Sequence, residues 1–240
     1  MTSDTPERAT PATVAEYAQL LSLAAHEFRT PASVVGGYLR MLQKDSGPLD
    51  ERQRKMIDEA AKSCARLVAL IGELSEIGKL DSSRAAIAIE AFDLFRDLDE
   101  VAANVQEGME REVRLQLSGT PGGARMSGDR QRLLAAFGAF FRALLREQPS
   151  AVTIVADRRV VTEMGRTSAV VVIAKDTDVQ RAYDAVKQPF DEYRGGMGLS
   201  LPIARRVVEQ AGGRLWAPVP VDDSDRSIRS AMVVSIPLLE

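Results

Sequence analysis

Apolar residues recur in alternating steps of three and four from Val14 to Leu42, and this spacing restricts the fold more than any other feature of the sequence. The series is Val14, Tyr17, Leu21, Ala24, Phe28, Pro31, Val35, Tyr38 and Leu42. A seam with this period predicts a long helix that packs against a second helix. A helix of about 30 residues would be roughly 45 Å long at 1.5 Å per residue.

A second apolar seam follows a turn-forming run at residues 44–48. Its positions are Ile57, Ala60, Cys64, Leu67, Ile71 and Leu74. Two long helices joined by a short loop predict an antiparallel hairpin in which the two seams face each other. In this arrangement Cys64 is expected to be a small buried hydrophobic residue.

Further apolar residues lie beside both seams, so the apolar stripe is wider than one partner helix can cover. These residues are Leu20, Ala25, Val34, Met41, Met56, Ala61 and Val68. A twofold dimer would cover the excess. We therefore expect two hairpins to form a dimeric four-helix bundle, which makes the chain a homodimer.

The composition of the 240 residues excludes several classes of protein. One cysteine rules out an internal disulfide and a cysteine-based zinc site, and one histidine rules out a histidine-rich metal centre. The net charge of -3 argues against a nonspecific nucleic-acid binder, which is normally basic. Residues 1–12 hold almost nothing to bury and are expected to be a disordered lead. Without a signal peptide or an apolar run of about 20 residues, the chain is expected to be cytoplasmic, with no membrane insertion.

The single histidine, His26, lies in the string HEFRTP at residues 26–31. If the seam faces inward, His26 points outward and shares a patch with Thr30, four residues on. An isolated histidine there could be a plain surface residue, and the zinc motif HExxH is excluded because Thr30 stands at the second histidine position. Pro31 predicts a kink, because proline in a helix interior costs about 3 kcal/mol.

This string, together with the heptad hairpin, resembles the dimerisation and phosphotransfer domain of sensor histidine kinases, whose H box reads HExxTP. The resemblance implies that His26 accepts phosphate from ATP and passes it to an aspartate in the receiver domain of a response regulator. It further implies that Glu27 is the acid that polarises the imidazole N–H, and that Thr30 positions water when the response regulator is dephosphorylated. Arg29 could meet the phosphate charge or be solvated.

After residue 81 the heptads stop and short strands alternate with helices, which predicts an α+β sandwich with helices on one sheet. Strands are expected at 86–90, 112–117, 151–161, 168–174, around 215 and at 233–236, and helices at 93–106, 129–146 and 199–210. The remainder, between 175 and 198, is expected to be a long loop.

A glycine-rich stretch at residues 195–199 precedes the last predicted helix. Backbone N–H groups of glycines can approach an anion closely, and a helix start adds partial positive charge. Such a loop can also be a plain turn. Placed after an H box, Gly196, Gly198 and Leu199 resemble the G2 box of the histidine kinase ATP-binding domain, and Phe190 matches its F box. The resemblance implies a Bergerat-type (GHKL) fold, with a phosphotransfer domain at 13–81 and an ATP-binding domain at 84–240.

The other nucleotide motifs of that family are altered here. Its N box supplies asparagines that hold magnesium and phosphates, whereas Gly138, Phe141 and Arg142 stand in the places of the two asparagines and the intervening acid. Arginine is purely a hydrogen-bond donor, so no oxygen ligand for Mg²⁺ remains at these positions. The positive charge of Arg142 could replace part of the charge of the metal ion on the phosphates. The G1 box at 176–180 keeps Asp176, which by resemblance binds the adenine amino group, but lacks both glycines. The resemblance thus implies ATP with Mg²⁺, while the residues present provide no metal ligand.

Two functions follow from these features. The first is a two-component histidine kinase core that phosphorylates His26 from ATP and donates the phosphate to a response regulator, with phosphatase activity toward that regulator. The alternative is a pseudokinase that does not use ATP and acts as a dimeric phosphotransfer protein, phosphatase or scaffold. In either case, only about a dozen residues precede the first helix, so the input is expected from an upstream sensor protein or from a region outside this chain.

Overall fold

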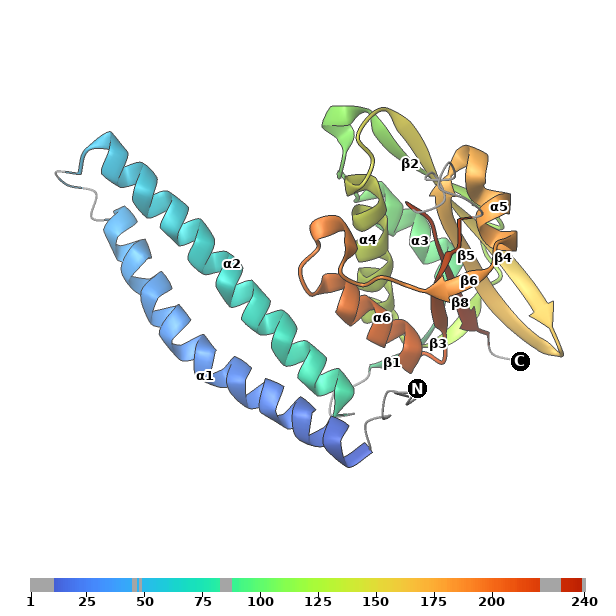
Figure 1. The fold of residues 1–240 in the computed structure, drawn as a ribbon, viewed down its shortest axis with the longest axis horizontal. Coiled ribbons are helices and arrows are strands. Elements are labelled where there is room, and N and C mark those ends of the chain that lie inside the picture. Colours follow the sequence, from blue (N-terminus) through green and yellow to red (C-terminus); the bar gives the residue numbers. More distant parts are fainter. Residues whose placement is uncertain (1–10, 45–46, 48, 83–87, 221–229, 239–240) are drawn as a thin grey trace, which may run out of the picture. The chain divides into compact units, whose positions relative to one another are not determined.

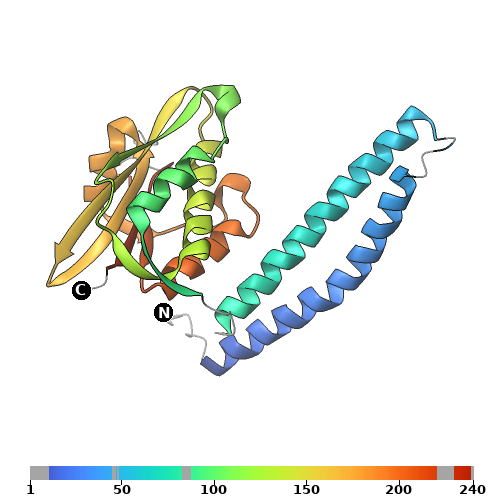
Figure 2. The same cartoon turned by 180° about the vertical axis from the view of Figure 1, so that it is seen from behind.

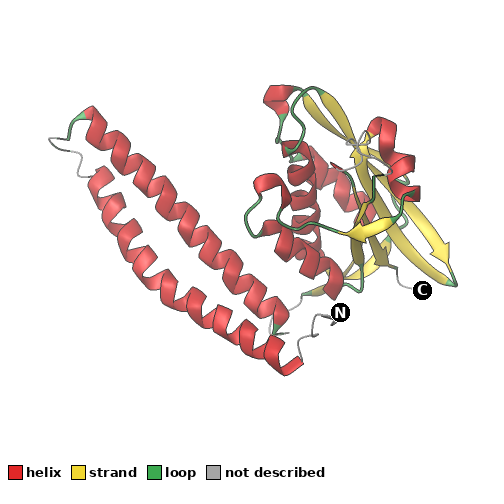
Figure 3. Cartoon of the chain, viewed as in Figure 1, coloured by secondary structure: helices red, strands yellow, loops and turns green. Residues whose placement is uncertain are grey.

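A computed structural model describes residues 11–44, 47, 49–82, 88–220 and 230–238, with backbone only for 11–15. The chain divides into two compact units, Met1–Ala85 and Ala86–Glu240. The first is a pair of long helices, and the second is a sheet with helices packed on it (Figure 1, Figure 3). This confirms the predicted fold class of a helical hairpin followed by an α+β unit. Of the predicted lead at 1–12, residues 1–10 lie outside the described residues, and Pro11 already belongs to a helix.

Helices α1 (Pro11–Lys44) and α2 (Glu51–Asp81) form the predicted antiparallel hairpin (Figure 1). Asp50 begins α2 with a capping box: its side chain accepts a hydrogen bond from the Gln53 N–H at 2.8 Å, and the Asp50 N–H donates to the Gln53 side chain at 3.0 Å. Helix α1 continues through Pro31. Because proline has no N–H, the carbonyl of Glu27 loses its usual helical donor, and α1 is visibly bowed in Figure 2.

Small residues make the face of α1 that is buried in the hairpin. They are Ala18, Ala25, Ala32 and Gly36. The prediction that the large seam residues of α1 face α2 is wrong. Five of them are between 48% and 64% exposed, namely Tyr17, Phe28, Val35, Tyr38 and Leu42. Small residues occupy this face because the helices approach closely: a β-carbon added at Gly78 of α2 would lie 2.6 Å from Oγ of Ser22.

On α2 the predicted seam is partly confirmed, because Cys64 and Ile71 are buried. The Sγ atom of Cys64 lies 3.3 Å from the carbonyl oxygen of Ala32, as expected for a small buried side chain. Ile71 packs with Ala25 and Ala32 in a core that also includes Leu74. Leu67, in contrast, is 50% exposed. The hairpin core is therefore narrow, and much of the apolar surface of both helices lies outside it.

The second unit is built on a six-stranded sheet in the order β2-β4-β5-β8-β7-β6. The strands are β2 (Val113–Gly119), β4 (Val152–Glu163), β5 (Arg166–Lys175), β6 (Lys187–Pro189), β7 (Arg214–Pro218) and β8 (Met232–Pro237). Only β2 and β4 pair in parallel. A separate antiparallel ribbon joins β1 (Ile89–Asp93) and β3 (Arg125–Asp129).

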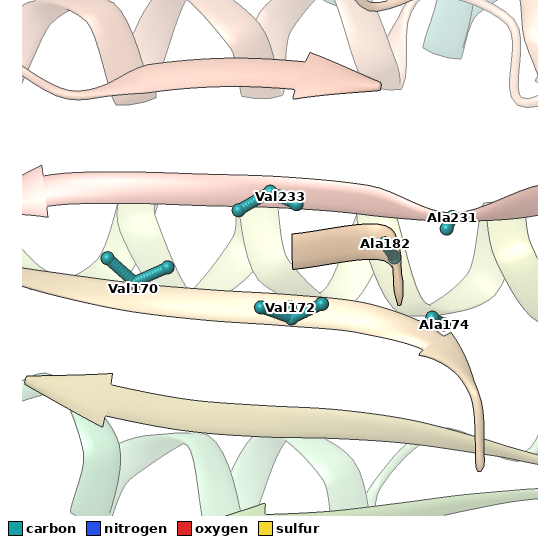
Figure 4. Close-up of a cluster of buried hydrophobic side chains, with 6 residues drawn as sticks. All are labelled: Val170, Val172, Ala174, Ala182, Ala231 and Val233. Carbon is teal, nitrogen blue, oxygen red and sulfur yellow. The ribbon is translucent and has the colours of Figure 1, made fainter. Parts of the chain in front are cut away.

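Helices cover both faces of this sheet. Helices α3 (Leu94–Ala103), α4 (Arg130–Arg146) and α6 (Ser200–Gln210) lie on one side, and α5 (Val179–Asp184) lies on the other (Figure 1, Figure 2). Helix α4 packs against α3 and α6, and its aromatic residues Phe137, Phe140 and Phe141 are fully buried. The core beneath α5 is made of smaller side chains, shown in Figure 4: Val170, Val172, Ala174, Ala182, Ala231 and Val233.

The helices predicted at 93–106 and 129–146 are confirmed as α3 and α4, and the structure shows that Asp93 and Asp129 are their N-caps. The predicted loop at 175–198 instead contains α5, β6 and two 3-10 turns, η2 (Asp176–Asp178) and η3 (Arg194–Gly196). These elements are too short to show a period. The predicted strand at 86–90 begins outside the described residues, and β1 starts at Ile89. Within the described residues, no helix combines the length and apolar composition that a bilayer span requires.

Candidate functional site

One candidate site, in the first unit, is the exposed surface of α1 around His26. Ala25 is buried against α2, so His26, the next residue, is turned away from the hairpin core and exposed. Glu27 and Thr30 are exposed as well. His26 and Thr30 are four residues apart on the continuous helix, and so lie one turn apart on the same side. The structure thus brings these two predicted residues together on an accessible patch.

A separate candidate site, in the second unit, is the glycine loop, residues 195–198, which leads into α6. Gly195, Gly196 and Gly198 have positive φ values of 68°, 59° and 63°, a conformation that favours glycine over other residues. Close packing also requires glycine at position 195. A β-carbon there would lie 3.2 Å from the Cα, Cβ and carbonyl oxygen of Ala143 in α4. The loop therefore lies directly against the last turn of α4.

Three side-chain contacts hold the segment before α6 on α4. Phe190, the predicted F-box residue, is buried with its ring centroid 6.2 Å from that of Phe140, edge to face. Arg194 forms a bidentate ion pair with Glu147: Nε of Arg194 lies 2.7 Å from Oε1 of Glu147, and Nη2 of Arg194 donates to Oε2 of Glu147.

Arg146 makes the third contact, because its Nη1 lies 3.4 Å from the carbonyl oxygen of Gly196. Its Nε also pairs with Glu107 at 2.9 Å. The loop is thus anchored on α4 by one aromatic contact and two arginines.

The structure places the other predicted nucleotide residues as follows. The Arg142 guanidinium lies back over Gly138, since a β-carbon added at Gly138 would be 3.2 Å from Nη1 of Arg142. The contact of the glycine loop falls on Ala143, the residue next to Arg142 in sequence. Asp176 follows β5, is exposed and accepts a hydrogen bond from the Thr177 N–H at 2.8 Å. Leu199 is the N-cap of α6 and carries no side-chain cap bond.

The side chains along this face of α4 fit phosphate but not Mg²⁺. Residues on this face of α4 repeat every four positions and are glycine, alanine or arginine: Gly138, Ala139, Arg142, Ala143 and Arg146. None of their side chains has an oxygen atom, and Mg²⁺ takes oxygen ligands. Among the residues that the structure describes, no group of three or more His, Cys, Asp or Glu side chains is placed to hold a metal ion. Guanidinium groups and loop N–H groups, in contrast, are donors suited to phosphate oxygens.

Comparison with known proteins shows which family the chain resembles. Residues 16–83 match the His Kinase A (phospho-acceptor) domain, a segment that includes His26, Glu27 and Thr30. The chain is similar to sensor histidine kinases, and curated relatives extend this similarity over most of its length. It is 26% identical over 208 residues to the swarming motility regulation sensor protein RssA of Serratia marcescens, covering 83% of the chain and 43% of RssA. It is 26% identical over 211 residues to the sensor protein GacS of Pseudomonas syringae pv. syringae, covering 82% of this chain and 23% of GacS.

Two solved structures share the fold of this chain. The full-length ShkA structure in complex with AMPPNP aligns with a TM-score of 0.66 at 18% identity, over 92% of this chain and 45% of ShkA. The Acinetobacter baumannii histidine kinase AdeS aligns with a TM-score of 0.54 at 16% identity, over 90% of this chain and 98% of AdeS. The chain spans less than half the length of the curated relatives RssA and GacS.

Four residues at the loop contact were not predicted from sequence: Ala143, Arg146, Glu147 and Arg194. A usable signal existed for Arg146, which stands four residues after Arg142 and therefore on the same row of α4. No comparable signal marks Glu147 or Arg194, because they are 47 residues apart and meet only in the folded unit.

Proposed function

We propose that this chain is the core of a two-component histidine kinase, in which His26 is phosphorylated from ATP and the phosphate then passes to an aspartate of a response regulator receiver domain. The observation that carries the proposal is the exposed HEFRTP patch on α1, inside a segment that matches the phospho-acceptor domain. We assign the phosphotransfer domain to residues 13–81 and the ATP-binding domain to 84–240.

His26 supplies the nucleophile. A neutral imidazole has one N–H and one nitrogen with a free lone pair, and that lone pair is what can attack phosphorus. Glu27 is exposed beside His26, and a carboxylate that accepts the ring N–H makes the opposite nitrogen more nucleophilic. Thr30, one turn on, has a hydroxyl that can orient water when the phosphorylated response regulator is dephosphorylated.

The glycine loop and α4 form the nucleotide half of the proposal. When bound, ATP supplies the phosphoryl group. Gly196 and Gly198 offer backbone N–H groups to phosphate oxygens, and Arg142 and Arg146 on α4 offer positive charge. Asp176 is exposed and can accept a hydrogen bond from the adenine amino group. The ShkA structure that shares this fold was determined in complex with AMPPNP.

Dimerisation through α1 and α2 completes the proposal. The large apolar residues that the hairpin leaves exposed include Leu20, Phe28, Val34, Tyr38, Met41, Met56 and Leu67. A continuous apolar stripe of this kind on a soluble hairpin marks an interaction surface. A second copy of the hairpin, presenting the same stripe around a twofold axis, would bury it in a four-helix bundle.

A phosphotransfer assay tests the second step of the proposed function. The chain would first be labelled from γ-labelled ATP and purified from the nucleotide, and then mixed with receiver domains from the same genome. Label should pass to one receiver domain within seconds to minutes and fail to pass when its acceptor aspartate is changed to asparagine. Label that stays on the chain with every receiver domain would contradict the proposed transfer.

The same assay examines the pseudokinase alternative. A wild-type chain that never takes label, yet removes phosphate from a phosphorylated receiver domain in a Thr30-dependent manner, would establish a phosphatase in place of a kinase. The match to the phospho-acceptor domain and the relatives, of which RssA matches over 83% of this chain, favour the kinase.

A further inference from the structure

The glycine loop lies beside carboxylates, and each of these already has a partner. Glu147 is paired with Arg194, Glu107 with Arg146 at 2.9 Å, and Glu192 with Arg205 at 3.2 Å. The remaining acid, Asp191, accepts a hydrogen bond from the Tyr193 N–H at 3.0 Å. Carboxylates neutralised by arginine have reduced attraction for a divalent cation, so the surroundings of the loop do not replace the oxygen ligands that α4 lacks.

Arg142 differs from these paired arginines. Among the residues that the structure describes, no hydrogen bond or ion pair is made to Arg142. It is half-buried, and its guanidinium lies over Gly138, where the absence of a side chain leaves room for it. Because the guanidinium group stays protonated at any physiological pH, Arg142 carries a fixed positive charge that no described acid neutralises.

Arg142 and Arg146 lie one turn apart on α4, and Arg146 reaches the carbonyl oxygen of Gly196. The two guanidinium groups therefore form a short row of donors that ends at the glycine loop, and Arg142 carries the positive charge in this row that no described acid neutralises, because Arg146 is paired with Glu107. Such a row is complementary to a chain of phosphate groups, because each guanidinium can donate two parallel hydrogen bonds to phosphate oxygens.

Given that this unit binds ATP as proposed above, we infer that it binds the nucleotide without a divalent cation, with Arg142 supplying the positive charge that Mg²⁺ supplies in a metal-dependent site and Arg146 donating hydrogen bonds beside it. The favoured ligand is then free ATP, not its magnesium complex. Free ATP carries two more negative charges than the complex, and a site made only of donors interacts more strongly with the more negative ligand.

Titration calorimetry with ATP tests this inference on the full chain, once in excess EDTA and once in millimolar MgCl₂. We expect binding in EDTA that is equal to or tighter than binding in MgCl₂. Arg142→Ala and Arg146→Ala should each weaken binding about tenfold in EDTA, as expected for a lost charge-assisted contact. Arg166→Ala is the matched control, because Arg166 is an exposed arginine at the turn between β4 and β5 and should bind like wild type.

Arg142→Asn adds a second, independent readout, because it removes the cation and introduces an amide oxygen that can ligate a metal. We expect this variant to bind weakly in EDTA and to recover part of its affinity in MgCl₂. Circular dichroism melting of each variant separates lost binding from lost folding.

Wild-type binding that requires MgCl₂ would overturn the inference while leaving the proposed kinase intact. Unchanged affinity in both Arg142→Ala and Arg146→Ala would overturn it as well. No binding in either buffer would overturn the inference together with the nucleotide step of the proposed function.

Discussion

Gly195 of the glycine loop rests on Ala143 of α4, so closely that a β-carbon at Gly195 would lie 3.2 Å from the Cα, Cβ and carbonyl oxygen of Ala143. The same glycine has a φ of 68°. Two separate constraints, packing and backbone conformation, therefore apply at one position. Variants that impose the backbone strain with and without the packing clash show whether the contact between the loop and α4 is needed for nucleotide binding.

Gly195→Ala should lower both stability and ATP affinity. The positive φ costs an alanine about 1–2 kcal/mol, and the new methyl group must push the loop away from α4. Gly165→Ala is the matched control: its φ is 75°, but nothing lies within 4 Å of a β-carbon there. Thermal melting should show a loss for both variants and a larger one for Gly195→Ala, whereas ATP titration should show a loss only for Gly195→Ala. Equal affinity in the two variants would mean that the contact with Ala143 is not needed.

Glu147→Gln should loosen the glycine loop. The side chains of Arg194 and Glu147 are only 11% and 20% exposed, so removing the carboxylate charge leaves a desolvated guanidinium, at a cost of the order of 2 kcal/mol. Hydrogen exchange should become faster at the backbone amides of residues 191–199. In the control, Glu209→Gln, the lost pair with Arg205 is 44% and 50% exposed and should cost less than about 0.5 kcal/mol. Unchanged exchange in Glu147→Gln would show that this ion pair does not hold the loop.

Gly78→Ala should destabilise the hairpin. A β-carbon at Gly78 would lie 2.6 Å from Oγ of Ser22 and 2.9 Å from the carbonyl oxygen of Ala18, so α1 and α2 would have to separate. Overpacking of this kind typically costs about 1–3 kcal/mol. Gly72→Ala, in the same helix with nothing within 4 Å, should instead be neutral or stabilising by up to about 1 kcal/mol. Chemical denaturation of the two variants makes the comparison, and a Gly78→Ala protein as stable as Gly72→Ala would refute the close packing.

Tyr38→Glu should dissociate the proposed dimer. Tyr38 is 64% exposed in the single chain and belongs to the apolar stripe, where a buried charge would be unpaired. Met164→Glu is the control, since Met164 is fully exposed at the turn between β4 and β5. Light scattering at micromolar concentration should give a dimer mass for wild type and Met164→Glu, and a smaller mass for Tyr38→Glu. A monomeric wild type would contradict the four-helix bundle.

The sequence predicted this fold well where the apolar pattern was clear, as in the helices expected at 93–106 and 129–146, which are α3 and α4. It predicted the wrong face for α1, because heptad reasoning assigns large apolar residues to the nearest partner helix. Here Ala18, Ala25 and Ala32 take that place and leave the large residues outside. Spacing alone cannot distinguish a seam within one hairpin from a seam between two.

The phosphoacceptor patch could be predicted because HEFRTP is contiguous and lies on one helix. The loop contact could be predicted only in part. Phe190, Gly196 and Gly198 form a local pattern, but Arg194 meets Glu147 only after the chain folds. The residue against the glycine loop is Ala143, which has no distinctive side chain and follows Arg142 by one position. A shift of one residue on a helix turns the side chain by about 100°, so small offsets in a motif alignment misplace a contact.

Phosphorylation of His26 is the measurement that tests the central claim most directly. Wild-type chain, His26→Ala and Thr30→Ala would each be incubated with γ-labelled ATP, in MgCl₂ and in EDTA, and the bound label tested for the acid lability of phosphohistidine. We predict acid-labile label on wild type and on Thr30→Ala and none on His26→Ala, since the chain has one histidine. Label that persists in His26→Ala, or wild type that takes no label in either buffer, would contradict the assignment of this chain as a histidine kinase core.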